Sequence, residues 1–275
     1  MSDPASASQS ARYAEGRILL DIESDGLAVI RFNNPAKHNA MSIEMWEGFA
    51  LALKEAAQRP EVRVLVLTGD GGKAFVSGAD ISQFETQRNS PQTRAEYERR
   101  SGAYGSLLSE FPRPTISCIR GYCMGGGLGV ALGTDIRIAS RGSRFGIPAA
   151  KLDIAYPFNG LRVLNALVGP SWARLLMYSA MQIDAAQAER IGLVTRMVED
   201  ETLWEDTLAL ARTIAGNAPL SVRASKVALD QIQKDPADRD MEAVRESAAR
   251  CARSEDSAEG RRAFMEKRAP RFVGR

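Results

Sequence analysis

Two glycine turns hold the residues in this chain that could stabilise negative charge during a reaction. The first is Gly78-Ala79-Asp80, and the second is the glycine run at 125–127, which follows an apolar stretch. A glycine turn after a buried strand exposes backbone N–H groups. Two such donors can hold a thioester oxygen as it becomes an enolate or a tetrahedral oxyanion. Either turn alone could equally be a tight turn without function.

The elements that must position these turns follow from the hydrophobic pattern. We expect strands at Ile18–Ile22 and Leu27–Phe32 around a hairpin turn, and a helix at Ile43–Gln58 that is capped by Ser42. Further strands are expected at 62–68, 75–76, 115–119, 135–139 and 143–146. Further helices are expected at 93–111, 126–132, 160–168, 171–179 and 184–190, and almost throughout from 203 to the end. This alternation predicts an α/β core.

Three regions are expected along the chain. Residues 1–16 are rich in Ser and Ala and predict a disordered tail. Residues 17–200 predict the core, and residues 201–275 a helical region that acts as an appendage or an oligomer contact. Asp184 and Thr202 each precede a Gln or Glu by three residues, the pattern of a capping box.

Composition excludes several classes of function. The net charge of +2 over 275 residues gives no reason to expect a nucleic-acid partner, and no apolar run is long enough to span a membrane. Three cysteines without metal-like spacing fit a reducing cytoplasm. The glycine run does not match the G-x-G-x-x-G pattern of dinucleotide-binding folds.

Several ordered segments together resemble one family. The matching segments are 32–42, 62–69, 73–81, 121–135, 192–194 and 263–268. On these segments the chain resembles the crotonase superfamily, the enoyl-CoA hydratase/isomerase fold. The resemblance implies a spiral of repeated ββα units, a helical C-terminal trimerisation region and an acyl-CoA substrate. It also implies a homotrimer or a hexamer built as a dimer of trimers, with coenzyme A as part of the substrate and no tightly bound cofactor or metal.

The resemblance also assigns roles to residues. It places the two oxyanion donors on the N–H groups of Ala79 and Gly126. The residues that it implies for coenzyme A binding are Ala36, Lys37, His38, Ala40, Ser77, Asp80, Ile81, Phe264 and Lys267. Phe264 and Lys267 resemble C-terminal residues that often approach coenzyme A from a neighbouring subunit. A lysine suits the phosphates of such a ligand as a point charge.

Both catalytic carboxylates of the family's hydratases are replaced. One glutamate is expected a helical turn beyond the oxyanion glycine, where this chain has Gly129, and the other follows Phe-Gly-x-Pro, where it has Ala149. Addition of water needs a base and an acid, which Gly and Ala cannot supply. Tyr156 and Asp153 are the candidate substitutes, and each could instead serve packing or a turn. Gly129 also predicts room for a bulky acyl group.

Other side chains are weaker candidates for the chemistry. Glu85 follows the first glycine turn and could approach an acyl group, although a surface role fits it as well. Cys123 could suggest a thiolate, but a lone cysteine more often packs as a small apolar residue. His38 is the only histidine in the chain, so a Ser-His-Asp triad would have to include it.

Three functions remain open from the sequence. The first is a hydratase or isomerase with substituted acid and base groups. The second is a decarboxylase or thioesterase, and decarboxylation would generate its own enolate without a base. The third is a non-catalytic acyl-CoA-binding scaffold.

Overall fold

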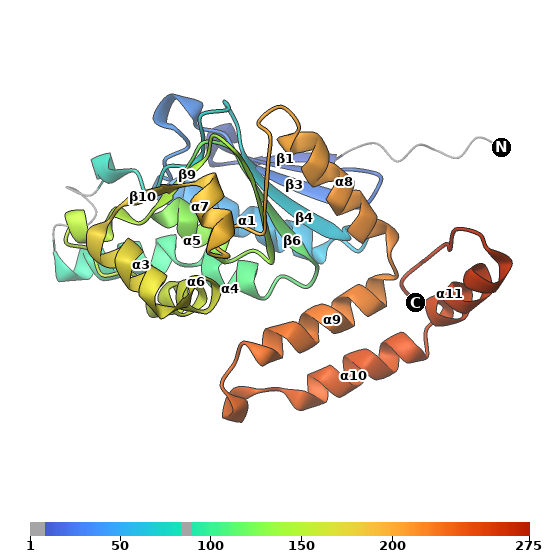
Figure 1. The fold of residues 1–275 in the computed structure, drawn as a ribbon. Coiled ribbons are helices and arrows are strands. Elements are labelled where there is room, and N and C mark those ends of the chain that lie inside the picture. Colours follow the sequence, from blue (N-terminus) through green and yellow to red (C-terminus); the bar gives the residue numbers. More distant parts are fainter. Residues whose placement is uncertain (1–8, 84–89) are drawn as a thin grey trace.

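The computed structural model describes residues 9–83 and 90–275 as two sheets wrapped by helices, with a helical arm beyond them (Figure 1). The large sheet has the strand order β1-β2-β3-β4-β6-β8-β11. Its strands are β1 Gln9–Tyr13, β2 Ile18–Ile22, β3 Leu27–Phe32, β4 Val64–Gly69, β6 Thr115–Ile119, β8 Ile136–Ser140 and β11 Arg196–Val198. From β3 to β11 the strands run parallel, and β1 and β2 complete the sheet in antiparallel pairs.

The small sheet has the order β10-β9-β7-β5. Its strands are β10 Gln182–Asp184, β9 Arg144–Gly146, β7 Tyr122–Met124 and β5 Ala74–Val76. Successive strand pairs along the chain place one strand in each sheet: β4 and β5, then β6 and β7, then β8 and β9. This repeat confirms the predicted spiral of ββα units.

Ten helices surround and extend the described sheets. They are α1 Ile43–Gln58, α3 Pro91–Ser101, α4 Tyr104–Ser109, α5 Gly126–Leu132, α6 Phe158–Ser179, α7 Ala185–Arg190, α8 Leu203–Gly216, α9 Pro219–Ile232, α10 Met241–Ala252 and α11 Glu255–Glu266. The bounds predicted for α1 are confirmed, and Ser42 Oγ accepts a hydrogen bond from the N–H of Met45 at 3.4 Å. Asp184 caps α7 by accepting from the N–H of Gln187 at 2.8 Å.

The large sheet is covered on both faces, which explains its continuous apolar strands. In β4, Leu65 and Leu67 belong to the core that includes α1, whereas Val64 and Val66 belong to a second core with Ala211 of α8. Helix α8 therefore closes the far face of the sheet. The core extends to residue 216, beyond the predicted boundary at 200, because the apolar face of α8 packs on the sheet.

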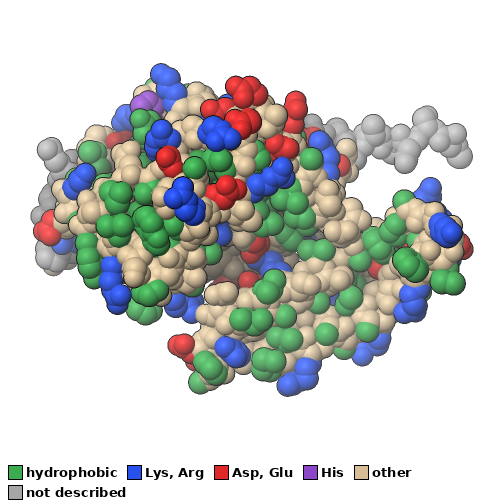
Figure 2. All heavy atoms as spheres, in the orientation of Figure 1, with side chains coloured by type: hydrophobic (Ala, Val, Ile, Leu, Met, Phe, Trp, Pro, Cys, Tyr) green, Lys and Arg blue, Asp and Glu red, His purple; other side chains and the backbone are tan. Residues whose placement is uncertain are grey.

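Helices α9, α10 and α11 form an arm that extends away from the two sheets (Figure 1). Polar contacts tie the arm to the body: Lys226 Nζ lies 2.6 Å from Asp135 Oδ1, and Arg63 donates to the carbonyl oxygen of Phe272 at 2.9 Å. Figure 2 shows hydrophobic side chains along the arm, where Leu229 is 61% and Ile232 62% exposed.

Several sequence predictions need correction. Residues 9–13 form strand β1, which pairs with β2, so the predicted disordered tail is wrong for this part. The predicted helix at 93–111 is two helices, α3 and α4. By contrast, the break predicted between helices at 160–168 and 171–179 is confirmed, because the backbone of α6 is non-helical at Gly169 (φ 75°, ψ 164°), just before Pro170. Thr202 makes no capping hydrogen bond, because its hydroxyl donates to Asp206 instead.

The described part of the chain contains no helix that is both long and apolar enough to cross a membrane. Nor do its His, Cys, Asp and Glu side chains come together in a group that could hold a metal ion.

Candidate active site

Parallel pairing of two short strands brings the two glycine turns together. Strand β5 pairs with β7, and Val76 lies opposite Cys123. Parallel strands end at the same edge of a sheet, so the turn after Val76 and the turn after Met124 are neighbours. Strand β7 was not expected as a separate element, because Gly121 was interpreted as the end of the preceding strand.

The backbone of the two turns requires glycine at several positions. Gly78 (φ 120°) and Gly125 (φ 51°, ψ −115°) adopt backbone conformations that L side chains rarely reach. A Cβ on Gly127 would lie 2.1 Å from the carbonyl oxygen of Val76, so a side chain there would overlap with β5. The glycines therefore let one turn press against the other.

The backbone N–H groups of Ala79 and Gly126 lie close together. The position of a Cβ on Gly126 would be 3.8 Å from the nitrogen of Ala79. Neighbouring groups in the first turn are engaged, since Met41 donates to the oxygen of Gly78 and Asp80 donates to the oxygen of Met41. No backbone hydrogen bond from the N–H of Ala79 or Gly126 is found within the described residues.

Two tyrosine hydroxyls occupy the space beside Gly129. A Cβ on Gly129 would lie 3.0 Å from Tyr156 Oη and 3.5 Å from Tyr104 Oη. The Tyr156 hydroxyl donates to the carbonyl oxygen of Gly125, inside the second glycine turn, at 3.3 Å. The prediction that Gly129 leaves room for a bulky acyl group is wrong in this form, because phenol oxygens fill the space where the side chain would begin.

The environment keeps both phenols protonated. Burial raises the pKa of Tyr156 well above its usual value, and the neighbouring Tyr104 and Cys123 raise it further. Burial alone raises the pKa of Tyr104 to about 12. At neutral pH both groups are therefore hydrogen-bond donors and potential acids, and neither is a base.

Trp46 of α1 forms a wall of the same site. Its atoms Cζ2 and Cη2 would lie 3.2 and 3.4 Å from a Cβ on Gly126. Its ring stacks on that of Tyr104, with ring centroids 4.8 Å apart and an interplanar angle of 14°. The sequence analysis missed Trp46 and Tyr104, because each sits on a helix far from the glycine run and reaches it only through the tertiary fold.

The position of the second family glutamate offers no acid or base. Ala149 is buried, with 6% of its surface exposed. Asp153 is exposed and has a left-handed backbone (φ 51°), as a turn residue would. Glu85 lies outside the described residues. Cys123 is fully buried, and burial raises the pKa of its thiol, so the structure supports packing rather than a thiolate.

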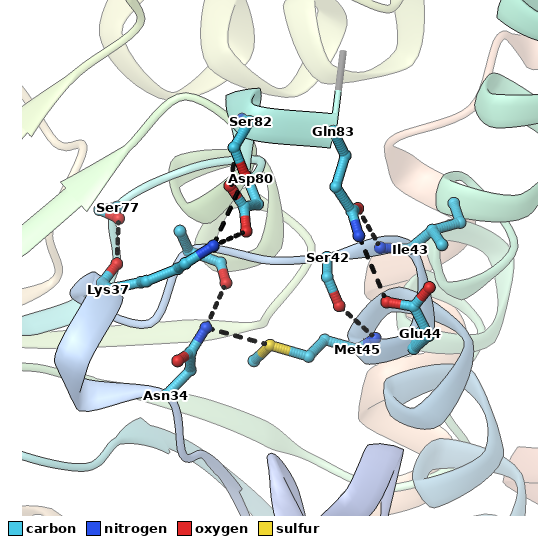
Figure 3. A network of polar contacts seen from close by, with 11 residues as sticks. Asn34, Lys37, Ser42, Ile43, Glu44, Met45, Ser77, Asp80, Ser82 and Gln83 are labelled. Carbon is cyan, nitrogen blue, oxygen red and sulfur yellow. Dashed lines mark hydrogen bonds and ion pairs between the residues drawn. The ribbon is translucent and has the colours of Figure 1, made fainter. Parts of the chain in front are cut away.

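The loop expected to bind coenzyme A is held against the first glycine turn (Figure 3). Lys37 Nζ lies 2.7 Å from Asp80 Oδ2, and Ser77 Oγ donates to the carbonyl oxygen of Lys37 at 3.4 Å. Burial raises the pKa of Asp80, but hydrogen bonds from Lys37 and Ser82 outweigh it and leave the pKa below its usual value. Lys37 and Asp80 are thus brought together as an ion pair, in which half of the Lys37 side chain, 54%, is exposed.

A buried asparagine anchors this loop. Asn39 Oδ1 accepts from the N–H of Asn34 at 2.8 Å, and its Nδ2 donates to the carbonyl oxygens of Asp70 and Ala74. All of its polar capacity thus serves to fix the loop to β5 and the turn before it. The side chain of Asn34 adds a hydrogen bond to the carbonyl oxygen of Ala40 at 3.1 Å.

The other residues expected to bind coenzyme A are divided between two places. Ala36, His38 and Ile81 are exposed on the surface near the first turn, and the ring of His38 stacks with that of Tyr122 at a centroid distance of 6.2 Å. Phe264 on α11 and Lys267, which follows the last residue of that helix, are exposed on the arm (Figure 1). A single chain therefore does not bring these last two residues to the glycine turns.

Comparison with known proteins decides the family. A family model described as enoyl-CoA hydratase/isomerase matches residues 22–275. The chain belongs to the enoyl-CoA hydratase/isomerase family. The chain is 34% identical over 262 residues to a crotonyl-CoA hydratase from Syntrophomonas wolfei, and the match covers 94% of this chain and 98% of that protein. It is also 34% identical over 252 residues to a short-chain-enoyl-CoA hydratase from Clostridium acetobutylicum, covering 90% and 94%.

Solved structures of the enoyl-CoA hydratase/isomerase family have the same fold. A crystal structure of an enoyl-CoA hydratase/carnithine racemase from Magnetospirillum magneticum matches with a TM-score of 0.90 and 32% identity. The match covers 96% of this chain and 97% of that one. The predicted superfamily and its α/β spiral are therefore confirmed.

Proposed function

We propose that this family member is an acyl-CoA enzyme that holds a thioester enolate on the N–H groups of Ala79 and Gly126 and protonates it from Tyr156. One observation carries the proposal: the space beside Gly129 holds two neutral phenols. A neutral phenol can donate a hydrogen bond or a proton but cannot abstract one. The site is therefore suited to receiving an enolate rather than to generating one by removing a proton.

Decarboxylation is the reaction that such a site favours. The bond between Cα and a carboxylate breaks, carbon dioxide leaves, and its bonding electrons form the enolate at the two N–H donors. The Tyr156 hydroxyl, which donates to Gly125 at 3.3 Å, turns to the substrate and gives its proton to Cα. Water then returns a proton to the phenolate, and no base is required.

Hydration or isomerisation is the second candidate. It is supported by relatives that are 34% identical and are described as crotonyl-CoA and short-chain-enoyl-CoA hydratases. In that case Tyr156 would act as the acid, and a base such as Asp153 would have to approach the acyl group. The exposed position of Asp153 makes this the weaker candidate.

A panel of acyl-CoA thioesters tests the proposal. A 2-carboxyacyl-CoA and a 2-enoyl-CoA are followed for release of carbon dioxide, hydration and release of coenzyme A, with deuterium incorporation at Cα measured in heavy water. Tyr156→Phe should lower the rate of decarboxylation by about 10²–10⁴-fold, the usual contribution of a positioned acid. Tyr178→Phe is the matched control, since that phenol is 76% exposed and should have no role.

The other outcomes decide against the proposal. Full activity in Tyr156→Phe would remove the phenol as the acid. If the protein hydrates the enoyl-CoA and Asp153→Asn abolishes this activity, the result would favour a hydratase. Release of coenzyme A alone would indicate a thioesterase, and binding without any reaction would indicate a scaffold.

We also propose that the arm joins subunits into a homotrimer or a hexamer. Phe264 is 82% exposed and lies with Leu229 and Ile232 on helices that extend beyond the body, where another copy could cover them. Phe264 and Lys267 would then reach the coenzyme A of a neighbouring subunit. Light scattering of the full chain measures the oligomeric state, and a monomer that retains activity would contradict the proposal.

A further inference from the structure

The indole N–H of Trp46 is buried without a hydrogen-bond partner. Trp46 is 3% exposed, and its Nε1 makes no hydrogen bond within the described structure. Among the residues that the structure describes, Arg31 Nε is the other buried side-chain nitrogen or oxygen without a hydrogen-bond partner, but another nitrogen of Arg31 lies 2.7 Å from Asp21. Trp46 has a single donor, so its whole hydrogen-bonding capacity is unused. Buried donors are rarely left unpaired, because the loss of their hydration is not compensated.

The indole that carries the unpaired donor borders the oxyanion turn. The atoms nearest to a Cβ on Gly126 are Cζ2 at 3.2 Å and Cη2 at 3.4 Å. Cζ2 and Nε1 are bonded to the same carbon of the indole, so Nε1 follows directly along that edge. A group bound at this turn would therefore lie against the same ring, whose contact atom Cζ2 is two bonds from Nε1.

Trp46 also belongs to a set of neutral donors. Its ring stacks on Tyr104 at 4.8 Å, and the hydroxyls of Tyr104 and Tyr156 lie 3.5 and 3.0 Å from the position of a Cβ on Gly129. Three donors on separate elements thus surround the region next to the oxyanion turn. Together they offer hydrogen bonds to an oxygen-rich group, and a purely hydrocarbon acyl chain would leave the indole N–H unpaired.

We infer that Trp46 donates its indole N–H to a carboxylate on the α-carbon of the acyl group, and that it selects 2-carboxyacyl-CoA thioesters over hydrocarbon acyl-CoA thioesters. A carboxylate has four lone pairs and accepts from several donors at once. The inference rests on the proposed function and names its substrate class. Trp46 is a specificity-determining residue in this scheme and takes no part in proton transfer.

Binding of two matched ligands tests this role separately from turnover. Malonyl-CoA carries a carboxylate where isovaleryl-CoA carries an isopropyl group of similar shape. Their dissociation constants are measured by calorimetry in Tyr156→Phe, with and without Trp46→Phe. The phenylalanine keeps an aromatic ring against Tyr104 but removes the N–H. Loss of a hydrogen bond to a charged group should weaken malonyl-CoA binding by about 10–100-fold and isovaleryl-CoA binding much less.

A spectroscopic measurement in the same Tyr156→Phe background gives an independent result. The chain has three tryptophans, so the indole N–H signal of Trp46 is assigned by its absence in Trp46→Phe. Malonyl-CoA should move this signal downfield, and isovaleryl-CoA should not. The inference would be overturned if Trp46→Phe weakened the binding of both ligands equally, or if malonyl-CoA left the position of the indole N–H signal unchanged. Release of carbon dioxide by Tyr156→Phe at the wild-type rate would instead overturn the proposed function, and the role of Trp46 would then be decided by the indole N–H signal.

Discussion

A methyl group at Gly129 should reveal how tightly Tyr156 is packed beside the second glycine turn. The Cβ of Gly129→Ala would lie 3.0 Å from Tyr156 Oη, so the phenol must move by a few tenths of an ångström. The movement strains the weak hydrogen bond from Tyr156 to Gly125. In Tyr156→Phe the hydroxyl is gone, and the same methyl group should fit.

Two opposing contributions set the size of the effect. Alanine in the interior of a helix is about 1 kcal/mol more favourable than glycine. Inserting an extra carbon into a well-packed region costs about 1–3 kcal/mol. In the wild-type background this cost offsets or outweighs the gain, so Gly129→Ala should leave the free energy of unfolding unchanged or lower it. In the Tyr156→Phe background only the helix preference of alanine remains, so Gly129→Ala should stabilise the protein by about 1 kcal/mol.

Urea unfolding of the two single variants, the double variant and the wild type measures this coupling. Gly260→Ala is the matched control, because Gly260 is in the interior of α11 and its Cβ would make an ordinary contact of 3.6 Å with Phe272. It should stabilise both backgrounds equally. Independent sites add to within about 0.3–0.5 kcal/mol. A coupling between positions 129 and 156 no larger than this would show that the phenol does not pack against Gly129.

Three further predictions concern other parts of the site. Gly127→Ala should destabilise the protein by several kcal/mol or prevent folding, because its Cβ would lie 2.1 Å from the Val76 oxygen; a thermal midpoint within a degree of wild type would refute the close contact. Lys37→Met should raise KM for an acyl-CoA about tenfold with little change in stability, and Asp80→Asn, which frees the lysine, should not raise it. Above pH 10 the unfolded chain releases the Tyr104 proton, while the folded protein keeps it until about pH 12, so the free energy of unfolding should fall between these two pH values. Tyr104→Phe should reduce this fall with pH. An unchanged slope in that variant would contradict the raised pKa of Tyr104.

Local signals in the sequence were enough to place the two glycine turns. Gly125 and Gly78 stand where a strand ends and the backbone must adopt a glycine conformation, and that requirement is contained in a few consecutive residues. The cap at Ser42 and the bounds of α1 were predictable for the same reason, since capping and helical periodicity act over one or two turns.

Tertiary contacts account for what the sequence did not reveal. Tyr104 and Trp46 reach the site from α4 and α1, and nothing local distinguishes them from ordinary core aromatics. The apolar face of α8 indicates that the helix is covered, but not whether a sheet or another subunit covers it. Strand β1 is held by backbone pairing and buries no side chain completely, so it leaves no hydrophobic pattern.

The spacing between the two glycines that flank β7 and the turn after it has a consequence for how this family member can change. A Cβ on Gly121 would lie 2.0 Å from the carbonyl oxygen of Lys73, just before β5, and a Cβ on Gly127 would lie 2.1 Å from that of Val76, at the end of β5. The chain between them spans β7 and must keep its length, because one inserted or deleted residue would shift the second N–H donor by about one strand residue, roughly 3.3 Å. Natural variants should therefore show substitutions but no insertions between 121 and 127, whereas the exposed turn at Gly71 and Gly72 can vary in length. New reactions can then arise by exchanging the side chains that face a fixed pair of donors.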